Sequence, residues 1–436
     1  MNGPDSPKAE EVAGIPSSTP APLTGCRHGR YDTPAMRDNG TIPSSADSGC
    51  GLYIHIPFCE TKCGYCDFYS VALKDRDPRP LVDCVIRELS HRAEGCPLPI
   101  RTVFCGGGTP TLLPLPDLAA LLSAIQRIVA VATLEEFTVE ANPATIDDDK
   151  ARLLVASGVT RVSMGAQSFF ADELKALERI HRVEDIAPSV EILRRNGVSQ
   201  INLDLIFGIP GQTLDTWSDS LGRAVALEPD HLACYGLTYE PGTKLTAQRD
   251  HQRIQPCDEN LEADMFLLTM DRLPQAGYTQ YEISNYARPG CQSAHNINYW
   301  RNGRYIGVGP SAAGYLNNRR YKNIADVAGY VRMIDEQGHA EAETETLDRS
   351  AILLETLMMQ LRLTEGMSIL SFRERVGVDP IELFSDTLAR LVKGGLVARN
   401  NDHIALTRQG QLVANAVIRD LAVAGGRTDI SLPIMG

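Results

Sequence analysis

Three closely spaced cysteines, Cys59, Cys63 and Cys66, are the residues of this sequence with the clearest capacity for chemistry. Thiolates at spacings of four and three residues in one short loop can converge on a single metal centre. Four thiolates would close a tetrahedral zinc site or saturate a four-iron cubane cluster, but Phe68 stands where a fourth cysteine would fall. A cubane held by three cysteines leaves one iron open for a ligand. The alternatives are a zinc site and reduced thiols in the core.

The elements that must position these cysteines alternate between strands and helices. Apolar runs end in glycine-rich or polar loops, and helical stripes such as Leu118, Leu121 and Ile125 lie between them. This alternation predicts an α/β fold with a parallel sheet, and six units are two short of a closed eight-stranded barrel. We therefore expect an open, partial (β/α)6 barrel of the TIM type. The expected strands are 52–56, 102–105, 137–143, 161–168, 201–208 and 232–237.

Polar and glycine residues gather at or near the carboxyl ends of these strands, where parallel βα folds place their chemistry. The run 106–109 offers free backbone groups to a ligand, although a tight turn explains it equally well. Glu140 and Asp204 suit a ribose hydroxyl or an ammonium group, and their burial without a partner would be costly. Gln167 and Arg179 can contact a carboxylate or a ribose, with an exposed helix charge as the alternative for Arg179. As a set on successive strands, these residues predict an active site.

Further motifs accompany C-x3-C-x2-C between residue 51 and about residue 330. They read LYIHIPFC, GGGTPT, EANP, GAQSF, RIH, NLDLIFGIPGQT and YEISNY. Nearly motif for motif, they resemble the oxygen-independent coproporphyrinogen dehydrogenase superfamily of radical S-adenosylmethionine (SAM) proteins. The resemblance implies a [4Fe-4S] cluster held by Cys59, Cys63 and Cys66. It also implies one SAM bound to the open iron and a second SAM site beside it.

The resemblance assigns roles to individual residues, which are expectations for this chain. The cluster-bound SAM would contact Tyr53, Gly107 and Glu140. The second site would be lined by Tyr65, Gly108, Thr109, Gln167, Arg179 and Asp204.

Two departures separate the sequence from the dehydrogenase proper. The cysteine motif of that enzyme continues to C-x3-C-x2-C-x-C, and this chain has Phe68 at the position of the last cysteine. The enzyme also has an N-terminal arm with the sequence Arg-Tyr-Thr-Ser-Tyr-Pro, and residues 30–34 of this chain match only the start of it. Coproporphyrinogen dehydrogenase activity is therefore not expected.

Residues 295–300 instead read His-Asn-Ile-Asn-Tyr-Trp, which resembles the H-N-x-x-Y-W motif of heme chaperones in the same superfamily. One imidazole beside two flat aromatic rings can ligate heme iron and pack against the macrocycle. His295 is therefore the expected heme ligand. The alternative is a hydrogen-bonded loop with Trp300 in the core.

Composition excludes several classes of protein. A net charge of −13 argues against a broad phosphate-binding surface, so no nucleic-acid partner is expected. There is no run of 18 apolar residues and no basic segment followed by an apolar one at the N-terminus, which predicts a cytoplasmic protein. Eight of the eleven cysteines have no paired spacing, which suits free thiols in a reducing cytosol rather than a disulfide framework.

The composition and the apolar pattern of the sequence change along the chain and predict four parts. Residues 1–49 carry seven prolines among small residues and are predicted to be disordered. Residues 50–290 form the predicted barrel, and residues 291–345 an extension that ends in the acidic linker Glu341–Glu345. Residues 346–436 are predicted to fold as a small winged-helix-like domain with a hairpin as its wing. Its ten basic and ten acidic residues lack a DNA-binding face, so packing or partner docking is expected.

The resemblance implies a heme chaperone that binds heme, a [4Fe-4S] cluster and SAM and delivers heme to acceptor proteins. The competing enzyme hypothesis is oxidative decarboxylation of coproporphyrinogen III, and the non-redox hypothesis is a zinc-binding structural protein. The expected partners are heme and heme-accepting proteins. A reductase or flavodoxin-type electron donor, peripheral membrane association through partners and a homodimer are further expectations.

Overall fold

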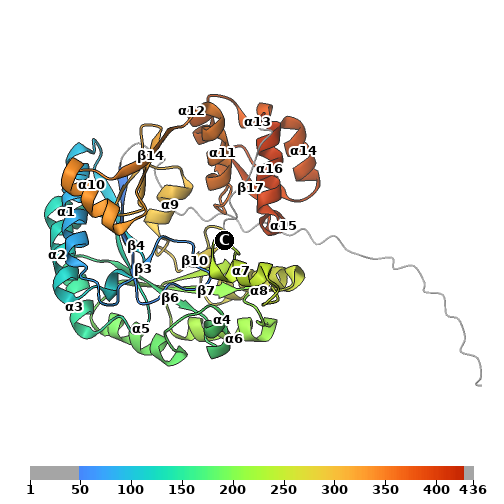
Figure 1. Cartoon of the computed structure of the whole chain (residues 1–436). Helices are drawn as coiled ribbons and strands as arrows, with labels where there is room; N and C mark the ends of the chain where they lie inside the picture. Colours follow the sequence, from blue (N-terminus) through green and yellow to red (C-terminus); the bar gives the residue numbers. More distant parts are fainter. Residues whose placement is uncertain (1–48, 427–436) are drawn as a thin grey trace, which may run out of the picture. The chain divides into compact units, whose positions relative to one another are not determined.

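The computed structural model describes residues 49–426, so the prediction of disorder for residues 1–49 lies outside the described residues except at Gly49. Within the described range, six parallel strands pair in chain order as the wall of an open barrel (Figure 1). They are β1 (Cys50–Ile56), β4 (Ile100–Gly107), β5 (Glu136–Ala141), β6 (Arg161–Gln167), β7 (Gln200–Phe207) and β8 (His231–Gly236). The predicted partial barrel with a parallel sheet is confirmed.

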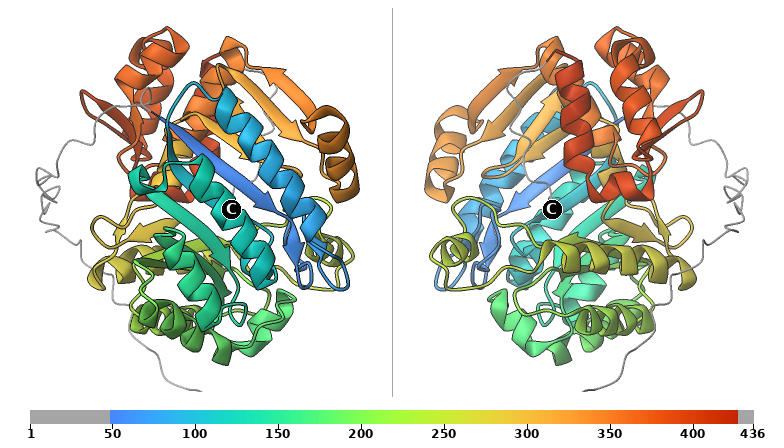
Figure 2. Two further views of the ribbon diagram at one scale, coloured as in Figure 1. Left: turned by 90° about the vertical axis from the view of Figure 1, so that its left-hand side faces the viewer. Right: turned by 90° about the vertical axis from the view of Figure 1, so that its right-hand side faces the viewer.

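Helices join these strands and cover the outer face of the sheet; Figure 2 shows the first of them, in blue, lying across β1. They are α1 (Arg79–Gly95), α2 (Leu115–Ile128), α3 (Asp148–Ala156), α4 (Ala171–Ala176), α5 (Ile186–Arg195) and α6 (Leu214–Ala226). On α2 the residues Leu118, Leu121 and Ile125 are fully buried, because recurrence at three and four residues places them on one face. The side chains of Asp147 and Thr213 cap α3 and α6 by accepting backbone N–H groups.

The two faces of the sheet differ in polarity. On β1, Leu52, Ile54 and Ile56 are fully buried in the apolar core against the helices. The alternate residues, such as Tyr53 and His55, lie on the inner face, because successive side chains of a strand point to opposite sides. Register neighbours share a face, so the inner face of the barrel also carries a set of buried polar side chains. This set comprises Thr102, Thr138, Arg161, Ser163, Asn202 and His231.

Additional strands continue the sheet at both edges of the barrel wall. Beyond β1 they are β11 (Tyr305–Val308), β12 (Ala313–Leu316), β13 (Arg319–Asn323) and β14 (Glu341–Thr346). Beyond β8 they are β10 (Asn285–Ala287) and β9 (Thr279–Gln280). The prediction of an acidic linker at Glu341–Glu345 is wrong, because this segment pairs with β13 as an edge strand. Helices α7 (Lys244–Asp250), α8 (Glu259–Gln275), α9 (Ala294–Trp300) and α10 (Val327–Gln337) complete this part.

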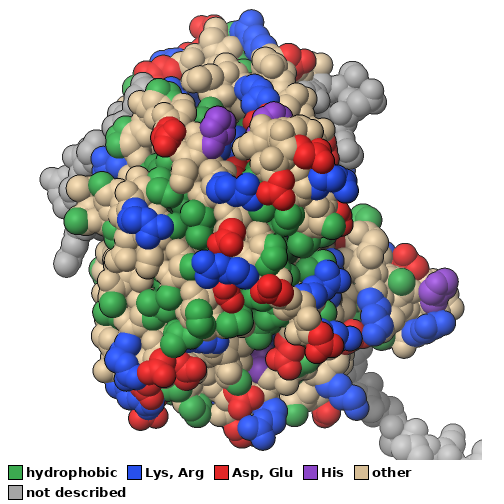
Figure 3. All heavy atoms as spheres, turned by 60° about the vertical axis from the view of Figure 1, so that its left-hand side comes forward, with side chains coloured by type: hydrophobic (Ala, Val, Ile, Leu, Met, Phe, Trp, Pro, Cys, Tyr) green, Lys and Arg blue, Asp and Glu red, His purple; other side chains and the backbone are tan. Residues whose placement is uncertain are grey.

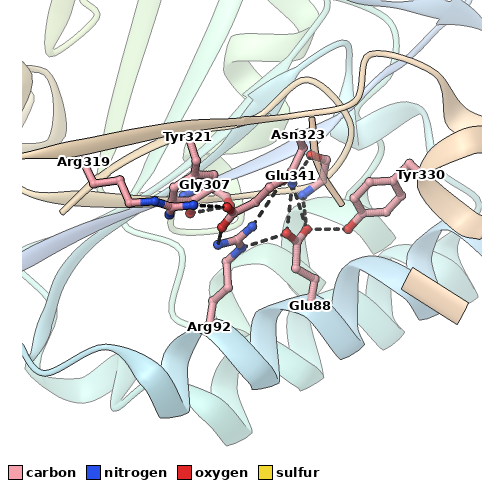
Figure 4. Close-up of polar contacts among 9 residues, drawn as sticks. Glu88, Arg92, Gly307, Arg319, Tyr321, Asn323, Tyr330 and Glu341 are labelled. Carbon is pink, nitrogen blue, oxygen red and sulfur yellow. Dashed lines mark hydrogen bonds and ion pairs between the residues drawn. The ribbon is translucent and has the colours of Figure 1, made fainter. Parts of the chain in front are cut away.

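A buried carboxylate, Glu88, fastens the extension to α1 (Figure 4). Its side chain is fully buried and accepts hydrogen bonds from Arg92 Nε (2.7 Å), Asn323 Nδ2 (2.9 Å) and Tyr330 OH (2.6 Å). The backbone N–H of Gly309, in the turn after β11, also donates to it at 2.9 Å. A buried charge is tolerated only when it is paired and hydrogen-bonded, so this group holds α1, β13, α10 and the β11 turn together.

The C-terminal region has its own apolar core. Its helices are α11 (Arg349–Gln360), α12 (Ile369–Val376), α13 (Pro380–Leu383), α14 (Ser385–Lys393), α15 (Arg408–Leu412) and α16 (Ala414–Ala424). Its strands are β15 (Met367–Ser368), β16 (Val397–Arg399) and β17 (His403–Leu406). The β16–β17 hairpin has the form expected for a wing, and β15 adds a strand that the sequence did not reveal. The Ile283 N–H donates to the Arg362 carbonyl at 3.1 Å, which joins this region to the barrel.

On the face drawn in Figure 3, Lys and Arg side chains alternate with Asp and Glu rather than forming one basic patch. Within residues 49–426, no helix has both the length and the apolar character needed to cross a bilayer.

Removing the Glu88 carboxylate should destabilise the fold. We expect Glu88→Ala to lower the free energy of unfolding by about 3–5 kcal/mol, because it removes one of the two carboxylates that pair with Arg92 and leaves the buried donors of Asn323, Tyr330 and Gly309 without this acceptor. Asp335→Ala is the control. Asp335 lies in α10 and forms an exposed ion pair with Arg87, which lies in α1 like Glu88. Loss of this exposed ion pair should lower the free energy of unfolding by at most about 1 kcal/mol. Urea denaturation measures both variants. Equal midpoints would contradict the structural role of Glu88.

Candidate functional site

The three predicted metal ligands lie in a loop that follows the carboxyl end of β1. Cys59 ends the short strand β2 (Phe58–Cys59), which pairs with β3 (Val71–Ala72). Cys63 and Cys66 stand between these strands in backbone without helix or strand. All three thiols are free and partly exposed. The loop thus places its cysteines at the end of the barrel where βα folds locate their chemistry.

Backbone hydrogen bonds from several elements hold this cysteine loop in place. The N–H of Gly64 donates to the Leu177 carbonyl after α4 at 3.3 Å, and the N–H of Leu245 in α7 donates to the Gly64 carbonyl at 2.7 Å. The N–H of Thr109 donates to the Phe58 carbonyl at 2.7 Å. The loop is therefore anchored to the β4 turn, α4 and α7.

The three thiols suit a cluster by their chemistry and by their position in one loop. Their side chains would have to rotate to converge on one metal centre. Burial raises the pKa of both Cys59 and Cys66, and the nearby Cys63 thiol raises each pKa further. As the side chains stand, no three His, Cys, Asp or Glu residues between 49 and 426 are grouped closely enough to enclose a metal ion.

The glycine loop after β4 packs against the cysteine loop. Gly107 has a φ of +99°, and a Cβ atom there would lie 2.3 Å from the His55 ring. A Cβ atom on Gly108 would lie 2.6 Å from the Phe58 carbonyl oxygen. Gly107 is therefore required by its left-handed φ and by the His55 ring, and Gly108 by the backbone packed against it. The N–H of Gly107 also donates to Glu140 Oε2 at 2.8 Å, so the turn orients a predicted ligand-binding carboxylate.

Glu140 and Tyr53, both expected at the cluster-bound SAM, are half-buried residues on the inner face of the barrel. Burial raises the pKa of Glu140 to about 8, and the Asp204 charge adds to this shift. Burial also raises the pKa of Tyr53, with Glu140 as the next cause. The Tyr53 OH shares a hydrogen bond with His55 Nδ1 (2.8 Å), and His55 Nε2 bonds the Tyr69 carbonyl (2.8 Å). A buried carboxyl of this kind is ready for a cationic partner such as an ammonium group.

Arg179 links the residues expected at the second SAM site. Its Nη2 donates to the Gly165 carbonyl (2.7 Å) and to Asn142 Oδ1 (2.5 Å), and its Nη1 contacts the Cys63 sulfur (3.5 Å). Asn142 Nδ2 donates in turn to Thr109 Oγ1 at 2.8 Å. Arg179 Nε is buried without a partner. The alternative of an exposed helix charge is thereby excluded for Arg179.

Gln167, Asp204 and Tyr65 complete this group. Gln167 has a left-handed φ of +64°, and its Oε1 is buried without a hydrogen-bond partner. Asp204 accepts from Asn202 Nδ2 at 2.7 Å, and burial raises its pKa to about 6. Burial raises the pKa of Tyr65, which the neighbouring Arg179 partly offsets. Strained backbone and unpaired buried polar atoms in one place are typical of a site that a polar ligand completes.

A surface pocket of about 110 Å³ opens beside this group and is lined in part by Thr109, Asn142 and His181. His181 is 6% exposed; its Nε2 bonds the Ala166 carbonyl at 3.1 Å, and its Nδ1 has no partner. Burial lowers the pKa of His181 to about 4, so the neutral ring offers Nδ1 as an acceptor. Sequence reasoning did not assign roles to His181 or Asn142. Their positions within the RIH and EANP motifs were the available signal.

His295 lies elsewhere, in α9 at the amino-terminal end of the barrel strands. Its Nδ1 shares a hydrogen bond with Thr102 Oγ1 (2.8 Å) and its Nε2 with Tyr299 OH (3.0 Å). The residue is 1% exposed, and burial lowers its pKa to about 3. An axial heme ligand needs a free ring nitrogen, and His295 has none. Both nitrogens being engaged favours the alternative of a hydrogen-bonded core histidine, and heme ligation by His295 stays a prediction.

The rest of the H-N-x-x-Y-W motif is also structural in its contacts. The segment is a helix rather than the loop considered as an alternative, and Glu136 caps it by accepting from Ser293 Oγ (3.0 Å) and the Ala294 N–H (2.8 Å). Trp300 is half-buried, and the Arg362 guanidinium carbon lies 4.9 Å from the centre of its ring. The motif thus joins the amino-terminal end of the barrel strands to the C-terminal region.

Comparison with known proteins identifies the family. The model of the radical SAM superfamily matches residues 53–224, and that of the HemN C-terminal domain matches residues 347–413. The chain is 35% identical over 367 residues to "Heme chaperone HemW" of Bacillus subtilis, covering 84% of this chain and 97% of that protein. The chain belongs to the HemW family of radical SAM proteins. HemW of Escherichia coli is 34% identical over 378 residues, covering 84% of this chain and 96% of that protein.

Membership in the HemW family agrees with the fold. Among solved structures, the chain is similar to the radical SAM enzyme coproporphyrinogen III oxidase (HemN) from Escherichia coli, with a TM-score of 0.73 and 24% sequence identity. The match covers 87% of this chain and 90% of that one, so the similarity extends over most of both chains. As a radical SAM family, the HemW family implies a [4Fe-4S] cluster and SAM.

Glu140 should make the stability of the SAM-free protein depend on pH. Because the pKa of Glu140 in the folded state is about 8, against 4.5 ordinarily, the folded state retains a proton that the unfolded state releases. Its contribution to stability is thus present at low pH and lost as pH rises through this window. Glu140→Gln should remove a slope of up to about 1.4 kcal/mol per pH unit.

Urea denaturation across that pH window measures the effect. Glu135→Gln is the matched control, because Glu135 is an exposed carboxylate beside the same strand β5. Parallel stability curves for wild type and Glu140→Gln would show that Glu140 is ionised in the folded protein and would refute the prediction.

Proposed function

We propose that this chain is a heme chaperone that binds heme and transfers it to acceptor proteins. The observation that carries the proposal is the match to proteins named heme chaperone along 84% of this chain and up to 97% of theirs. The family models match residues 53–224 in the barrel and 347–413 in the C-terminal region. Heme-accepting proteins are the proposed partners, and a reductase or flavodoxin-type protein is the proposed electron donor. A homodimer and membrane association through partners belong to the same proposal.

Cys59, Cys63 and Cys66 are the proposed ligands of a [4Fe-4S] cluster. The cluster, when bound, supplies an open iron for SAM and one-electron chemistry. Glu140 would accept hydrogen bonds from the SAM ammonium group, because it is a buried carboxyl that already faces the glycine loop. Tyr53 would support this carboxyl from the neighbouring strand.

A second SAM is proposed beside the first, against Arg179 and its neighbours. Arg179 Nε and Gln167 Oε1 supply an unpaired donor and an unpaired acceptor. Thr109 and Asp204 add polar groups on either side, and Gly108 allows close approach of the backbone. Tyr65 contributes an aromatic ring from the cysteine loop itself. A ligand with carboxylate and hydroxyl groups would satisfy these buried atoms.

Oxidative decarboxylation of coproporphyrinogen III is the competing activity. The similarity to HemN concerns the fold, and the position of the fourth cysteine of the dehydrogenase motif is held by Phe68, whose side chain is 61% exposed. Phenylalanine has neither a thiolate nor a proton to contribute there. The chaperone function is therefore preferred over the dehydrogenase.

Anaerobic reconstitution with iron and sulfide separates the hypotheses. We expect visible absorption from an iron–sulfur cluster that Cys59→Ser and Cys66→Ser abolish, while Cys257→Ser, a partly exposed cysteine outside the loop, leaves it intact. A colourless protein holding zinc would refute the cluster. With SAM, reductant and coproporphyrinogen III, the reconstituted protein should form no protoporphyrinogen, and it should bind added heme. Robust protoporphyrinogen formation would instead establish the dehydrogenase.

Heme binding should be independent of His295. We expect His295→Ala to leave the heme affinity and absorption spectrum unchanged but to lower the free energy of unfolding by about 1–3 kcal/mol, because Thr102 and Tyr299 lose their buried partner. Heme titration and urea denaturation of the same preparation give both quantities. A shifted Soret band with unchanged stability would restore His295 as the heme ligand.

A further inference from the structure

The surface pocket beside His181 is a cavity that the proposed function leaves unused. Its lining residues come from the segments that follow β4, β5 and α4 and from the cysteine loop, and Thr109 alone among them is also proposed for the second SAM. The pocket has a volume of about 110 Å³. A water molecule takes up ~30 Å³ in the liquid, so there is room for roughly three or four groups of that size. The pocket therefore suits a small ligand or the end of a larger one.

Hydrogen bonds hold the walls of this pocket in place. The Lys150 ammonium donates to the carbonyls of Thr111 (2.6 Å) and Thr145 (3.3 Å), and the hydroxyls of these two threonines share a hydrogen bond of 2.8 Å. The N–H of Ala144, a residue with a left-handed φ of +66°, donates to Ser189 Oγ at 3.1 Å. The walls are thus fixed by contacts within the protein, and a ligand would enter a preformed pocket.

His181 contributes an unused hydrogen-bond acceptor to the wall. The Ala166 carbonyl can only accept, so the Nε2 that contacts it at 3.1 Å carries the ring proton. The Nδ1 of the neutral ring is then an acceptor, and it has no hydrogen-bond partner in the part of the chain that the structure describes. Because the side chain is 6% exposed, this acceptor is withdrawn from water. A donor group on a ligand would satisfy it.

The two carboxylates that line the pocket are acceptors as well. The exposed Glu60 carboxylate has no hydrogen bond or ion pair to another residue between 49 and 426. Asp185 accepts from the N–H (2.8 Å) and the guanidinium (3.1 Å) of Arg182 and keeps further lone pairs. The cationic groups of Lys150, Arg179 and Arg182 are bonded to other acceptors, and none of these residues lines the pocket. The polar part of the wall therefore calls for a ligand that donates hydrogen bonds.

The rest of the wall is apolar and comprises Leu112, Pro143, Ala144 and Ile180. Ile180 is 50% exposed, so an alkyl chain packed against it would remove apolar surface from water. An ammonium group donates three hydrogen bonds and accepts none. Acceptors beside apolar side chains therefore match a protonated amine on a short alkyl chain.

We propose that this pocket binds a primary ammonium group on a short alkyl chain, with His181 Nδ1, Glu60 and Asp185 as its acceptors. Two sources carry this chemistry, namely the amino-acid end of the second SAM and a lysine side chain of a partner protein. The first source rests on the proposed function, whereas the ammonium pocket itself does not.

Calorimetric titration of the full-length protein with n-butylammonium tests the pocket. We expect a dissociation constant on the order of 1 mM, because a ligand of so few atoms binds weakly. n-Butanol, which has the chain without the charge, and tetramethylammonium, which has the charge without an N–H, should each bind about tenfold more weakly or less. The absence of heat from n-butylammonium would mean that water alone fills the pocket and would overturn the proposal. Equal affinity for n-butanol would overturn it too.

Two variants locate the binding in this pocket. His181→Leu should weaken n-butylammonium binding about tenfold, because it removes a buried acceptor of a charged donor. Glu60→Gln should weaken it about twofold to fivefold, because the charge that it removes is exposed and screened. His91→Leu in α1 and Glu184→Gln beside Asp185 are the matched controls, since both side chains are exposed and neither lines the pocket. Glu60→Gln changes an exposed side chain and so tests the pocket even if His181→Leu does not fold. Unchanged affinity in the folded variants would overturn the proposal.

Titration of the reconstituted protein with SAM separates the two sources of the ammonium group. If the pocket takes the amino-acid end of SAM, His181→Leu will weaken the binding of SAM but not of 5′-methylthioadenosine, which lacks the amino acid. SAM binding that changes neither with His181→Leu nor with added n-butylammonium would assign the pocket to a lysine side chain. A wild-type protein that binds n-butylammonium but no SAM would refute the proposed SAM sites and leave the ammonium pocket standing.

Discussion

The hydrogen bonding of β1 between β4 and β11 is the constraint on which the rest of the site depends. β1 delivers the cysteine loop at its carboxyl end, and the N–H of Gly108 bonds the Ile56 carbonyl at 2.8 Å as the two chains leave the sheet. Because Gly107 and Gly108 have no side chains, the β4 turn can press against that loop. The cysteines and the glycine turn therefore share one place, although more than forty residues of chain separate them.

The interior of the barrel is arranged around charges that are expensive to bury. Glu140, Asp204 and Arg179 come from different elements, and each is withdrawn from water near the carboxyl ends of the strands. Partial pairing, as between Arg179 and Asn142, reduces the cost without removing it. The remaining unpaired atoms favour a zwitterionic, hydroxyl-bearing ligand over an apolar one. The physical chemistry of the site and the family membership thus point to the same class of cofactor.

Sequence patterns predicted those parts of the molecule in which local chemistry and burial agree. Buried strands appear as apolar runs and their exits as glycine or polar residues, so the six barrel strands were recognisable. The edge strand at Glu341–Glu345 was not, because a solvent-exposed edge carries charges instead of an apolar alternation. The hydrogen-bond partners of a histidine are set by tertiary contacts, so sequence could not distinguish His295, with both nitrogens bonded, from His181, with one free.

The extra strands at the two sides of the barrel wall have a further consequence. An unclosed barrel would ordinarily present two bare strand margins, which invite other chains to add on and polymerise. Here β10 occupies one margin and β11 the other, and the outermost strand β14 turns Glu343 and Glu345 toward solvent, where like charges on an approaching copy repel. A molecule built in this way can leave its wall incomplete and still resist edge-to-edge pairing with other copies.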